Sequence, residues 1–496
     1  MSEEVFRKFV LEHSADDPAR LILNRNKWPD VDVNAAATAI ECRRKIRTKL
    51  PEWYAEAGIV YPDRICAEQS SSSATAEYKA RVAAGIISRS SPGRSSVDGK
   101  VNELEGAAAS LSMGGRVADL TGGLGVDSLA FSRVASRVLY NEMNSERAEA
   151  ARHNFTLLGA GNIEIISHCV QPEDSLSESG VADSCSFWAA LREFRPDLVY
   201  MDPARRSATG GKVFLLEDCS PDVLTLLPGI FSIVPDLLLK LSPMADISML
   251  VRRLAECGAG VREVHVVASA GECKELLLWV RPDTECDTTL IVNENGHILS
   301  FPASAFGNGS AIESSGTECA SLFLDGSGWL RSMQYLFEPG KALSKAGLFN
   351  AVCTLFSGQP SVGQTSFGDD HSSAPQPYFH IVKAGRSTHL YFIDSLQPVD
   401  DAVVSSDERV IPDIRNFGKI FRILEAAPLD RQSIKAFSTR YPKAEVSARN
   451  IPMTSDELRK RLKVSSGGDV HIFGLRMDFS SAPSANYLIA ATRGAL

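Results

Sequence analysis

The sequence lacks several features that would reveal a function directly. Its ten cysteines are scattered singly and form no C-x-x-C pair, so zinc ribbons, iron–sulfur sites and thioredoxin-like redox motifs have no support. The N-terminal residues MSEEVFRKFVLEHSADD contain no apolar secretory core. The longest apolar stretch, 226–241, is broken by two prolines, an aspartate and a lysine. These absences predict a soluble cytoplasmic protein with reduced thiols.

Positive charge is also in short supply. The 496 residues include 52 Lys and Arg against 61 Asp and Glu, a formal net charge of -9. A surface that is basic throughout is therefore excluded, and a nucleic-acid partner would have to meet a local patch. The nine histidines show no metal-ligand spacing, so we expect no metal. The hydrophobic fraction of 44% is that of a globular chain, long enough for three or four domains.

The chain changes character along its length. Residues 1–95 predict a helical region, with a Ser/Gly/Pro-rich linker at 87–96. Residues 96–285 alternate short apolar runs with helical stretches, and a second low-complexity stretch lies at 357–377. Beyond 285, TLIVN, SLFLDG, YFHIV and THLYFID predict strands of a smaller α+β unit. The last hundred residues add the basic helix DELRKRLKV and the strands VHIFGLRM and YLIAAT.

The middle segment has the pattern of a doubly wound sheet. Seven apolar runs separated mostly by helices predict strands at 116–120, 137–143, 162–167, 197–203, 236–243, 261–269 and 275–282. Strands that alternate with helices form a mostly parallel α/β sheet. The last two runs are joined only by the short AGECK turn, which predicts a terminal antiparallel hairpin.

The first strand leads into a glycine-rich turn. Asp119 ends the strand, TGGLG follows at 121–125, and Asp127 begins a helix. Glu142 ends the next strand, where a carboxylate can accept both hydroxyls of a ribose. A dinucleotide favours G-x-G-x-x-G, but the third glycine is missing and Asp127 would repel a pyrophosphate. The form D-x-x-x-G-x-G instead resembles motif I of class I S-adenosylmethionine-dependent methyltransferases, whose cofactor carries a sulfonium and an amino group. A turn without any ligand is the alternative.

The fourth strand ends in Asp202-Pro203-Ala204-Arg205-Arg206. Ligands of open α/β sheets bind outside the carboxyl ends of the strands, at the switch point beside the first strand. The segment resembles the D/N-P-P-aromatic motif IV of methyltransferases that act on exocyclic amines, in which the Asp or Asn orients the amine. The aromatic is absent and Arg205 takes its place. Arg205 could stack on a base, hold a phosphate, or form a structural ion pair with Asp202.

Two further segments leave alternatives open. In Gln69-Ser70-Ser71-Ser72-Ser73, a serine could cap the following helix, or Gln69 and its neighbours could reach the methionine part of the cofactor. His168 follows the third strand, and we expect a surface histidine there, which leaves adenine recognition unassigned. The predicted cofactor-binding residues are Gln69, Asp119, Thr121, Gly122, Gly123, Gly125, Asp127 and Glu142.

Together these motifs resemble a known family. EQSSSSATAEYKA, DLTGGLGVDSLAFS, MDPARR and GECKELLLW, with the later YLFEP, ARNIP and LRKRLK, are similar to S-adenosylmethionine-dependent methyltransferases that carry a C-terminal THUMP-like domain. The resemblance implies a Rossmann-like class I methyltransferase core at 96–285 behind the helical region 1–95. It also implies a ferredoxin-like α+β unit at 286–410 and a THUMP-like domain at 411–496. THUMP domains accompany RNA-modifying enzymes, so RNA is the implied substrate class.

The charge distribution offers a patch for such a substrate. Residues 431–463 carry nine Lys and Arg against three acids, a local charge of +6. The predicted RNA-binding residues are Arg449, Arg459, Lys460, Arg461 and Lys463. A second basic run, RRKIRTK at 43–49, could bind RNA or be a solvated helix face.

These features predict an S-adenosylmethionine-dependent methyltransferase that acts on structured RNA at a base nitrogen, with Asp202, Pro203 and Arg205 in the catalytic loop. No cysteine lies in that loop, which disfavours a thiolate mechanism. A methyltransferase for a protein or small molecule is the first alternative, with the C-terminal units serving assembly. A non-catalytic RNA-binding protein with a vestigial cofactor fold is the second. An oxidoreductase that binds NAD is more remote.

Overall fold

The computed structural model describes residues 3–90, 114–173, 182–205, 215–285, 287–302, 332–349, 351–356, 381–385, 387–394, 413–480 and 482–493. The chain forms two compact units. The first comprises residues 1–269 and 274–289, and the second comprises residues 270–273 and 290–496.

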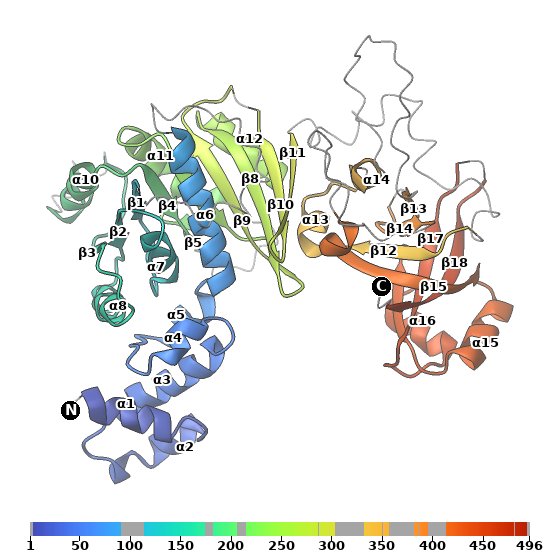
Figure 1. Ribbon diagram of the computed structural model, residues 1–496, viewed down its shortest axis with the longest axis horizontal. Coiled ribbons are helices and arrows are strands. Elements are labelled where there is room, and N and C mark those ends of the chain that lie inside the picture. The colour runs from blue at the N-terminus through green and yellow to red at the C-terminus, as the bar shows by residue number, and fades with distance from the viewer. Residues whose placement is uncertain are drawn as a thin grey trace, which may run out of the picture. The chain divides into compact units, whose positions relative to one another are not determined.

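The first unit begins with the expected helices (Figure 1), which are α1 (Glu3–Glu12), α2 (Pro18–Leu23), α3 (Val33–Ile46), α4 (Pro51–Ala55), α5 (Arg64–Gln69) and α6 (Ser73–Ser90), with a 3-10 turn at Arg25–Lys27. Aspartates start several of them. The Asp17, Asp32 and Asp63 carboxylates accept bonds from the first backbone N–H groups of α2, α3 and α5. The linker expected from residue 87 is wrong at its start, because the apolar residues Ile86 and Ile87 are buried and keep α6 helical to Ser90.

The seven predicted strands of the middle segment are confirmed. They are β1 (Arg116–Asp119), β2 (Arg137–Asn141), β3 (Ile163–Ile166), β4 (Leu198–Met201), β7 (Leu237–Leu241), β8 (Gly260–Ser269) and β9 (Glu272–Arg281). Within this unit they lie in the order β8-β9-β7-β4-β1-β2-β3. The five neighbouring strands β7, β4, β1, β2 and β3 are parallel to one another, whereas β9 pairs with β7 in the antiparallel sense. This reversed last strand departs from the all-parallel order of dinucleotide-binding folds.

Helices connect and cover these strands. They are α7 (Val126–Ser132), α8 (Ser145–Leu157), α10 (Ala182–Phe194), α11 (Val223–Phe231) and α12 (Ile247–Glu256). A short ribbon, β5 (Ala204–Arg205) with β6 (Cys219–Ser220), follows β4, and a 3-10 turn at Leu216–Asp218 precedes β6. Helix α6 packs against α7, β4 and β8, so this last helix of the N-terminal region lies against the sheet (Figure 1). Continuous apolar strands such as β4, buried at every residue, are what a sheet covered on both faces requires.

The second unit begins with the strands β10 (Thr289–Glu294) and β11 (His297–Pro302), which are not part of its main sheet. The main sheet is mixed and seven-stranded, in the order β13-β14-β12-β15-β18-β17-β16. The bounds of these strands are β12 (Tyr335–Pro339), β13 (Ile381–Lys383), β14 (Tyr391–Ile393), β15 (Gly418–Pro428), β16 (Glu445–Arg449), β17 (Val470–Met477) and β18 (Ala485–Arg493). The predicted strand SLFLDG and the stretch 357–377 lie outside the described residues.

Among the described residues of this unit, the helices are α13 (Lys341–Lys345), α14 (Ala351–Phe356), α15 (Arg431–Arg440) and α16 (Ser455–Leu462), with a 3-10 turn at Ile414–Phe417. Helices α15 and α16 contribute Phe437, Leu458 and Leu462 to one apolar core, and this leaves their opposite faces to solvent. Among the described residues, no helix combines the length and the hydropathy that a membrane crossing requires.

Candidate functional site

The predicted crevice lies between β1 and β4. These two strands are neighbours, while β2 lies on the other side of β1, so the chain changes direction at this point of the sheet. The loops that follow β1 and β4 touch each other, because the backbone N–H of Asp202 donates to Thr121 Oγ1 at 2.7 Å. The glycine turn and the Asp202-Pro203 segment therefore form one wall.

A cavity of about 800 Å³ opens beside this wall. Its lining includes every predicted cofactor-binding residue, together with Asp202. Among the described lining residues, the carboxylates are Asp119, Asp127, Glu142 and Asp202, and the only Arg or Lys is Arg147. The guanidinium of Arg147 is itself paired with Asp63 at 2.9 Å. The cavity thus favours a cationic ligand.

The glycine turn uses its own N–H groups internally. Thr121 N–H donates to Asp119, Gly122 N–H to Asn141 O, Gly123 N–H to Glu142, and Gly125 N–H to Gly122 O, over 2.8–3.0 Å. A phosphate-binding turn presents such groups to the ligand. Because four of the five N–H groups at 121–125 are already engaged, this turn is poorly suited to a pyrophosphate.

The three glycines of the turn answer different steric needs. A Cβ on Gly122 would lie 2.1 Å from the Tyr140 ring, and a Cβ on Gly125, whose φ is +93°, would lie 2.5 Å from the Phe155 ring. At Gly123, with φ of +56°, a Cβ would find only the Thr121 carbonyl oxygen, 4.0 Å away. Packing therefore accounts for two of the glycines, and only Gly123 faces open space where a ligand can approach.

Asp119 is almost fully enclosed, with 1% of its surface exposed. Its carboxylate accepts bonds from Thr121 N–H at 3.0 Å and from the Ser128 hydroxyl at 2.6 Å. Burial raises the pKa of Asp119 to about 7, although both hydrogen bonds act to lower it. The side chain fixes the turn to α7 and changes charge near neutral pH.

Glu142 ends the β2 edge of the cavity, as predicted. Its carboxylate accepts one bond from Gly123 N–H at 3.0 Å and one from Asn144 N–H at 2.9 Å. Each carboxylate oxygen has a second lone pair, so it can still accept a hydroxyl. The next residue, Met143, is 71% exposed at the cavity edge and offers an apolar surface there.

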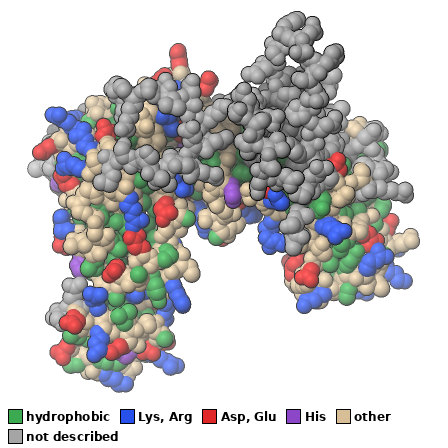
Figure 2. All heavy atoms as spheres, viewed as in Figure 1, with side chains coloured by type: hydrophobic (Ala, Val, Ile, Leu, Met, Phe, Trp, Pro, Cys, Tyr) green, Lys and Arg blue, Asp and Glu red, His purple; other side chains and the backbone are tan. Residues whose placement is uncertain are grey.

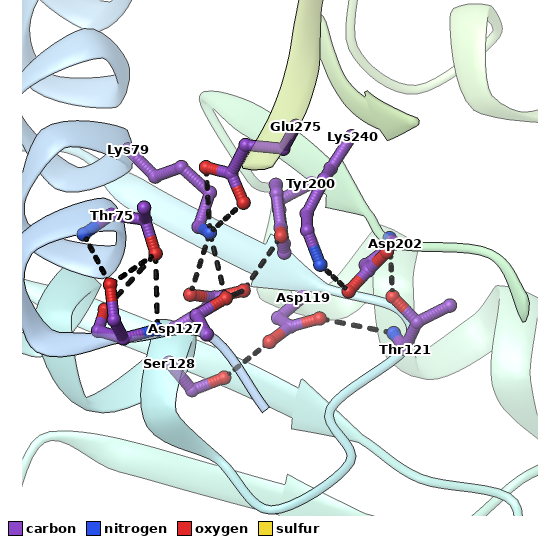
Figure 3. Close-up of polar contacts among 12 residues, drawn as sticks. Thr75, Lys79, Asp119, Thr121, Asp127, Ser128, Tyr200, Asp202, Lys240 and Glu275 are labelled. Carbon is purple, nitrogen blue, oxygen red and sulfur yellow. Dashed lines mark hydrogen bonds and ion pairs between the residues drawn. The ribbon is translucent and has the colours of Figure 1, made fainter. Parts of the chain in front are cut away.

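A buried ionic cluster lies behind the turn (Figure 3). The Lys79 ammonium of α6 has no exposed surface and lies 3.2 Å from Asp127 and 3.0 Å from Glu275 of β9. It donates hydrogen bonds to the Ser71 hydroxyl at 2.8 Å and to both carboxylate oxygens of Glu275 at 3.1 and 3.0 Å, which uses all three of its protons. The Asp127 carboxylate in turn accepts bonds from the hydroxyls of Tyr200, at 2.7 Å, and Ser71, at 3.0 Å.

The pKa values of the two carboxylates in this cluster, Asp127 and Glu275, are shifted in opposite directions. Burial acts to raise the pKa of Asp127, but Lys79 and Lys240, with the Tyr200 and Ser71 hydrogen bonds, outweigh it and lower that pKa. At Glu275 burial prevails over the same two lysines and the pKa is raised.

Asp202 is paired with a lysine that the sequence analysis did not single out. Lys240, from the middle of β7, donates a hydrogen bond to Asp202 Oδ2 (Figure 3). The Lys240 side chain is 14% exposed and that of Asp202 is 34% exposed. Burial acts to lower the pKa of Lys240, but Asp202, Glu275 and Asp127 together raise it, so this lysine is a cation.

The serine run starts helix α6, and its contact with a cofactor stays a prediction. Ser72 and Thr75 exchange bonds that start α6, with Thr75 N–H donating to Ser72 Oγ at 3.2 Å. Gln69, Ser70 and Ser71 line the cavity. His168 is half-buried on the cavity wall, held through its backbone by Asn141, so the expectation of a surface histidine is wrong.

The rest of the catalytic loop is braced by the β5–β6 ribbon. Pro203 is buried, and Ala204 pairs with Ser220, which lines the cavity together with Pro221. The backbone of Arg205 pairs with Cys219, while its side chain, and all of Arg206, lie outside what the structure describes. The roles considered for Arg205 therefore stay predictions.

The two basic runs differ in their contacts. In the N-terminal run, Arg43 is buried and donates to the carbonyls of Glu56 and Tyr54. Arg44 donates to the carbonyls of Ser14 and Asp16, Lys45 pairs with Glu68, and Lys49 donates to the carbonyls of Ala67 and Glu68. These contacts tie the N-terminal helices together, while Arg47 is exposed, and RNA binding by this run stays a prediction.

In the C-terminal run, three side chains have acidic partners. Arg440 pairs with Glu425, Arg449 with Glu338 and Arg459 with Asp456. Six others are exposed, and their side chains form no hydrogen bond or ion pair that the structure shows with another described side chain. They are Arg431, Lys435, Lys443, Lys460, Arg461 and Lys463. Figure 2 shows Lys and Arg side chains on the part of the surface where α15 and α16 lie.

Sequence reasoning missed Lys79, Lys240 and Glu275. One signal was available for Lys240, because a lysine interrupts the otherwise apolar strand LLLKL. Lys79 and Glu275 are 196 residues apart, and no local pattern connects them.

Comparisons with known proteins agree with this architecture. Residues 418–492 match the family described as THUMP domain-like. A crystal structure from Porphyromonas gingivalis W83, described as a "putative methyltransferase", is similar over 99% of this chain and 98% of its own, at 26% identity and a TM-score of 0.68. A "putative RNA methyltransferase" from Pyrococcus horikoshii covers 42% of this chain and 82% of its own, at 15% identity and a TM-score of 0.25. No curated protein matches the sequence.

The full-length similarity and the family match support the same division of the molecule. The parallel sheet with its helical N-terminal region has a methyltransferase fold, and the mixed C-terminal sheet carries the THUMP-like residues. By its architecture, this chain is a methyltransferase-like protein with a C-terminal THUMP-like domain.

Proposed function

We propose that this protein is an S-adenosylmethionine-dependent methyltransferase that acts on structured RNA at a base nitrogen. The observation that carries the proposal is the acidic cavity at the β1–β4 crevice, with Asp202 at its wall. The methyltransferase fold supplies the framework, and the THUMP-like domain supplies the suggestion of RNA.

The cavity residues fit this cofactor better than a dinucleotide. A sulfonium and an amino group are cationic, and four carboxylates line the cavity with one arginine, which is paired with Asp63. Two of the four, Asp127 and Asp202, are also paired with Lys79 and Lys240. The engaged N–H groups of the turn leave little for a pyrophosphate, whereas the open side of Gly123 permits close approach. Glu142 would hold the ribose hydroxyls, and Asp119 and Asp127 would lie nearest the methionine end. When bound, the cofactor supplies an electrophilic methyl group.

The protein's own contribution at the acceptor is orientation. Asp202 is held from both sides, by the bond from its N–H to Thr121 and by Lys240 on its carboxylate. A carboxylate fixed in this way can accept a hydrogen bond from an amino group and aim the nitrogen lone pair into the cavity. No group of three or more His, Cys, Asp or Glu suited to a metal ion occurs among the described residues, and this role of Asp202 needs none.

RNA is favoured over a protein or a small molecule by the C-terminal surface. The six exposed Lys and Arg on and beside α15 and α16 stand in a chain whose net charge is -9. Such a local excess is the pattern expected for phosphate contacts. A small neutral substrate would gain nothing from it.

The test is transfer of labelled methyl from S-adenosylmethionine to total RNA from a strain that lacks the gene, since that RNA retains its unmodified sites. We expect label in RNA with the native protein and at least a roughly 100-fold loss with Asp202→Ala. Asp202→Asn and S-adenosylhomocysteine binding serve as controls for folding. Label in protein or small molecules instead would move the proposal to the first alternative, and binding of RNA without any transfer would support the second.

A further inference from the structure

Lys240 lies beside Asp202, and its side chain is 14% exposed. The ammonium of Lys79 donates hydrogen bonds to the Ser71 hydroxyl and to both carboxylate oxygens of Glu275, and it forms an ion pair with Asp127. Among the described residues, the structure shows one hydrogen-bond partner for the Lys240 ammonium, Asp202 Oδ2. Lys79 thus joins several buried groups, whereas the hydrogen bond of Lys240 goes to Asp202.

The pairing constrains Asp202 in two ways. The lysine fixes one oxygen, Oδ2, and Thr121 fixes the backbone of Asp202 at the cavity wall (Figure 3). For the other oxygen, Oδ1, the structure shows no hydrogen bond among the described residues. A carboxylate held this way can accept a hydrogen bond from an amino group in the cavity.

We propose that Lys240 is a positioning residue of the methyl-transfer site, which holds the Asp202 carboxylate in place at the cavity wall and thereby selects an amino group as the methyl acceptor. The inference rests on the proposed function. An amino group attacks as the neutral amine, whereas an amide N–H or a ribose hydroxyl must first lose its proton to a base.

The step balances without any further reactant. The amine nitrogen uses its lone pair to form the new N–C bond while the C–S bond of the methyl donor breaks, and the sulfur keeps that electron pair. The methylated nitrogen is then cationic and strongly acidic, so it gives one proton to Asp202 Oδ1, from which water removes it. A carboxylate paired with a lysine can accept a proton from so strong an acid.

The first experiment compares Lys240→Met in two backgrounds. We expect Lys240→Met to lower the turnover number about 100-fold in the native background, with the KM for S-adenosylmethionine and the affinity for S-adenosylhomocysteine changed less than about twofold. In the Asp202→Asn background the same substitution should cost less than about threefold, since the charge through which Lys240 acts is gone. Equal losses in both backgrounds would overturn the proposal.

Two variants guard against a folding defect. Lys240→Arg keeps the positive charge and should recover about tenfold of the loss, whereas a purely structural role would make Arg as damaging as Met. Lys8→Met removes a lysine that is paired with Glu12 on α1 and should leave turnover and binding unchanged. No recovery with Lys240→Arg, together with weakened S-adenosylhomocysteine binding in Lys240→Met, would count against positioning.

The second experiment identifies the methylated nucleoside after digestion of the labelled RNA. Label on an exocyclic amino group is the expected result. Label on an amide ring nitrogen, a ring carbon or a ribose oxygen would overturn this inference but leave the RNA methyltransferase proposal standing. Absence of label from RNA would overturn the proposed function and this inference with it.

Discussion

The two basic runs look alike in the sequence and behave differently in the structure. The run at 43–49 spends its charges on backbone carbonyls and on Glu68, inside the N-terminal helical region. In the run at 431–463, eight of the nine Lys and Arg are exposed, and six of these form no ion pair with another described residue. From this comparison we expect a local charge excess to mark a binding surface only where packing leaves the side chains to solvent.

The same contrast extends to the whole of each region. Around the cavity, charges such as Lys79, Lys240 and Asp119 are buried and paired, so they fix geometry. Around α15 and α16 they are solvated, and their effect reaches a partner only through the field they create. Substitutions should therefore damage stability in the first region and binding in the second.

The largest effect is expected from Lys79→Met. This substitution leaves Asp127 and Glu275 facing each other without the cation between them. Breaking a buried ion pair from one side costs about 3–5 kcal/mol, so the free energy of unfolding should fall by that amount in chemical denaturation. Lys8→Met, at an exposed pair on α1, should change it by less than about 0.5 kcal/mol. A loss below about 1 kcal/mol for Lys79→Met would contradict the structural role of the cluster.

The second effect is a dependence on pH. Burial raises the pKa of Asp119 to about 7 from the ordinary aspartate value of 3.8. Between about pH 4 and pH 7 the folded state therefore holds a proton that the unfolded state has lost, and Asp119 makes the protein less stable as pH rises through this window. The free energy of unfolding of Asp119→Asn, relative to that of the native protein, should rise by about 2–4 kcal/mol from pH 4 to pH 7.

Denaturation at several pH values measures this difference. Asn can still accept from Thr121 N–H and bond to Ser128, so the turn is kept. A constant difference between the two proteins across the window would show that Asp119 is ionised throughout.

The third effect concerns RNA binding. Neutralising Lys435, Lys460, Arg461 and Lys463 to Gln should weaken the affinity for a labelled RNA hairpin about 10- to 30-fold at moderate salt. The slope of the logarithm of the binding constant against that of the salt concentration should become shallower by about 3, since each lost phosphate contact removes about 0.7 in single strands. The free energy of unfolding should change by less than about 0.5 kcal/mol, because these side chains are exposed. An unchanged salt slope would remove this surface from the proposed interface.

The smallest effect is the matched substitution in the N-terminal run. Lys45→Gln removes one charge whose partner is Glu68, with the two side chains 40% and 52% exposed. Such a pair contributes roughly 0–1 kcal/mol, and the RNA affinity should stay within about twofold of the native value. A loss of affinity comparable to that of one C-terminal substitution would erase the distinction between the two runs.

The sequence predicted the fold well because its signals are local. The strand–turn–helix at 116–132, the parallel strands and the final hairpin follow from apolar runs, glycines and short connections, and the structure has all of them. Glu142 and Asp202 were found for the same reason, since each ends a strand next to β1 and the carboxyl ends of parallel strands meet. The histidine at 168 was misjudged because its backbone, held by Asn141, brings it onto the cavity wall.

By itself the sequence determined the doubly wound sheet, the acidic residues at its crevice and the extent of the two basic runs. Only the tertiary structure decided which charges meet. Lys79, Asp127 and Glu275 come from three elements that adjoin only after the sheet has assembled, and Lys240 reaches Asp202 because β7 pairs with β4. Burial then separates charges that fix a site from charges that remain free to attract a partner, and burial depends on contacts distant in the chain.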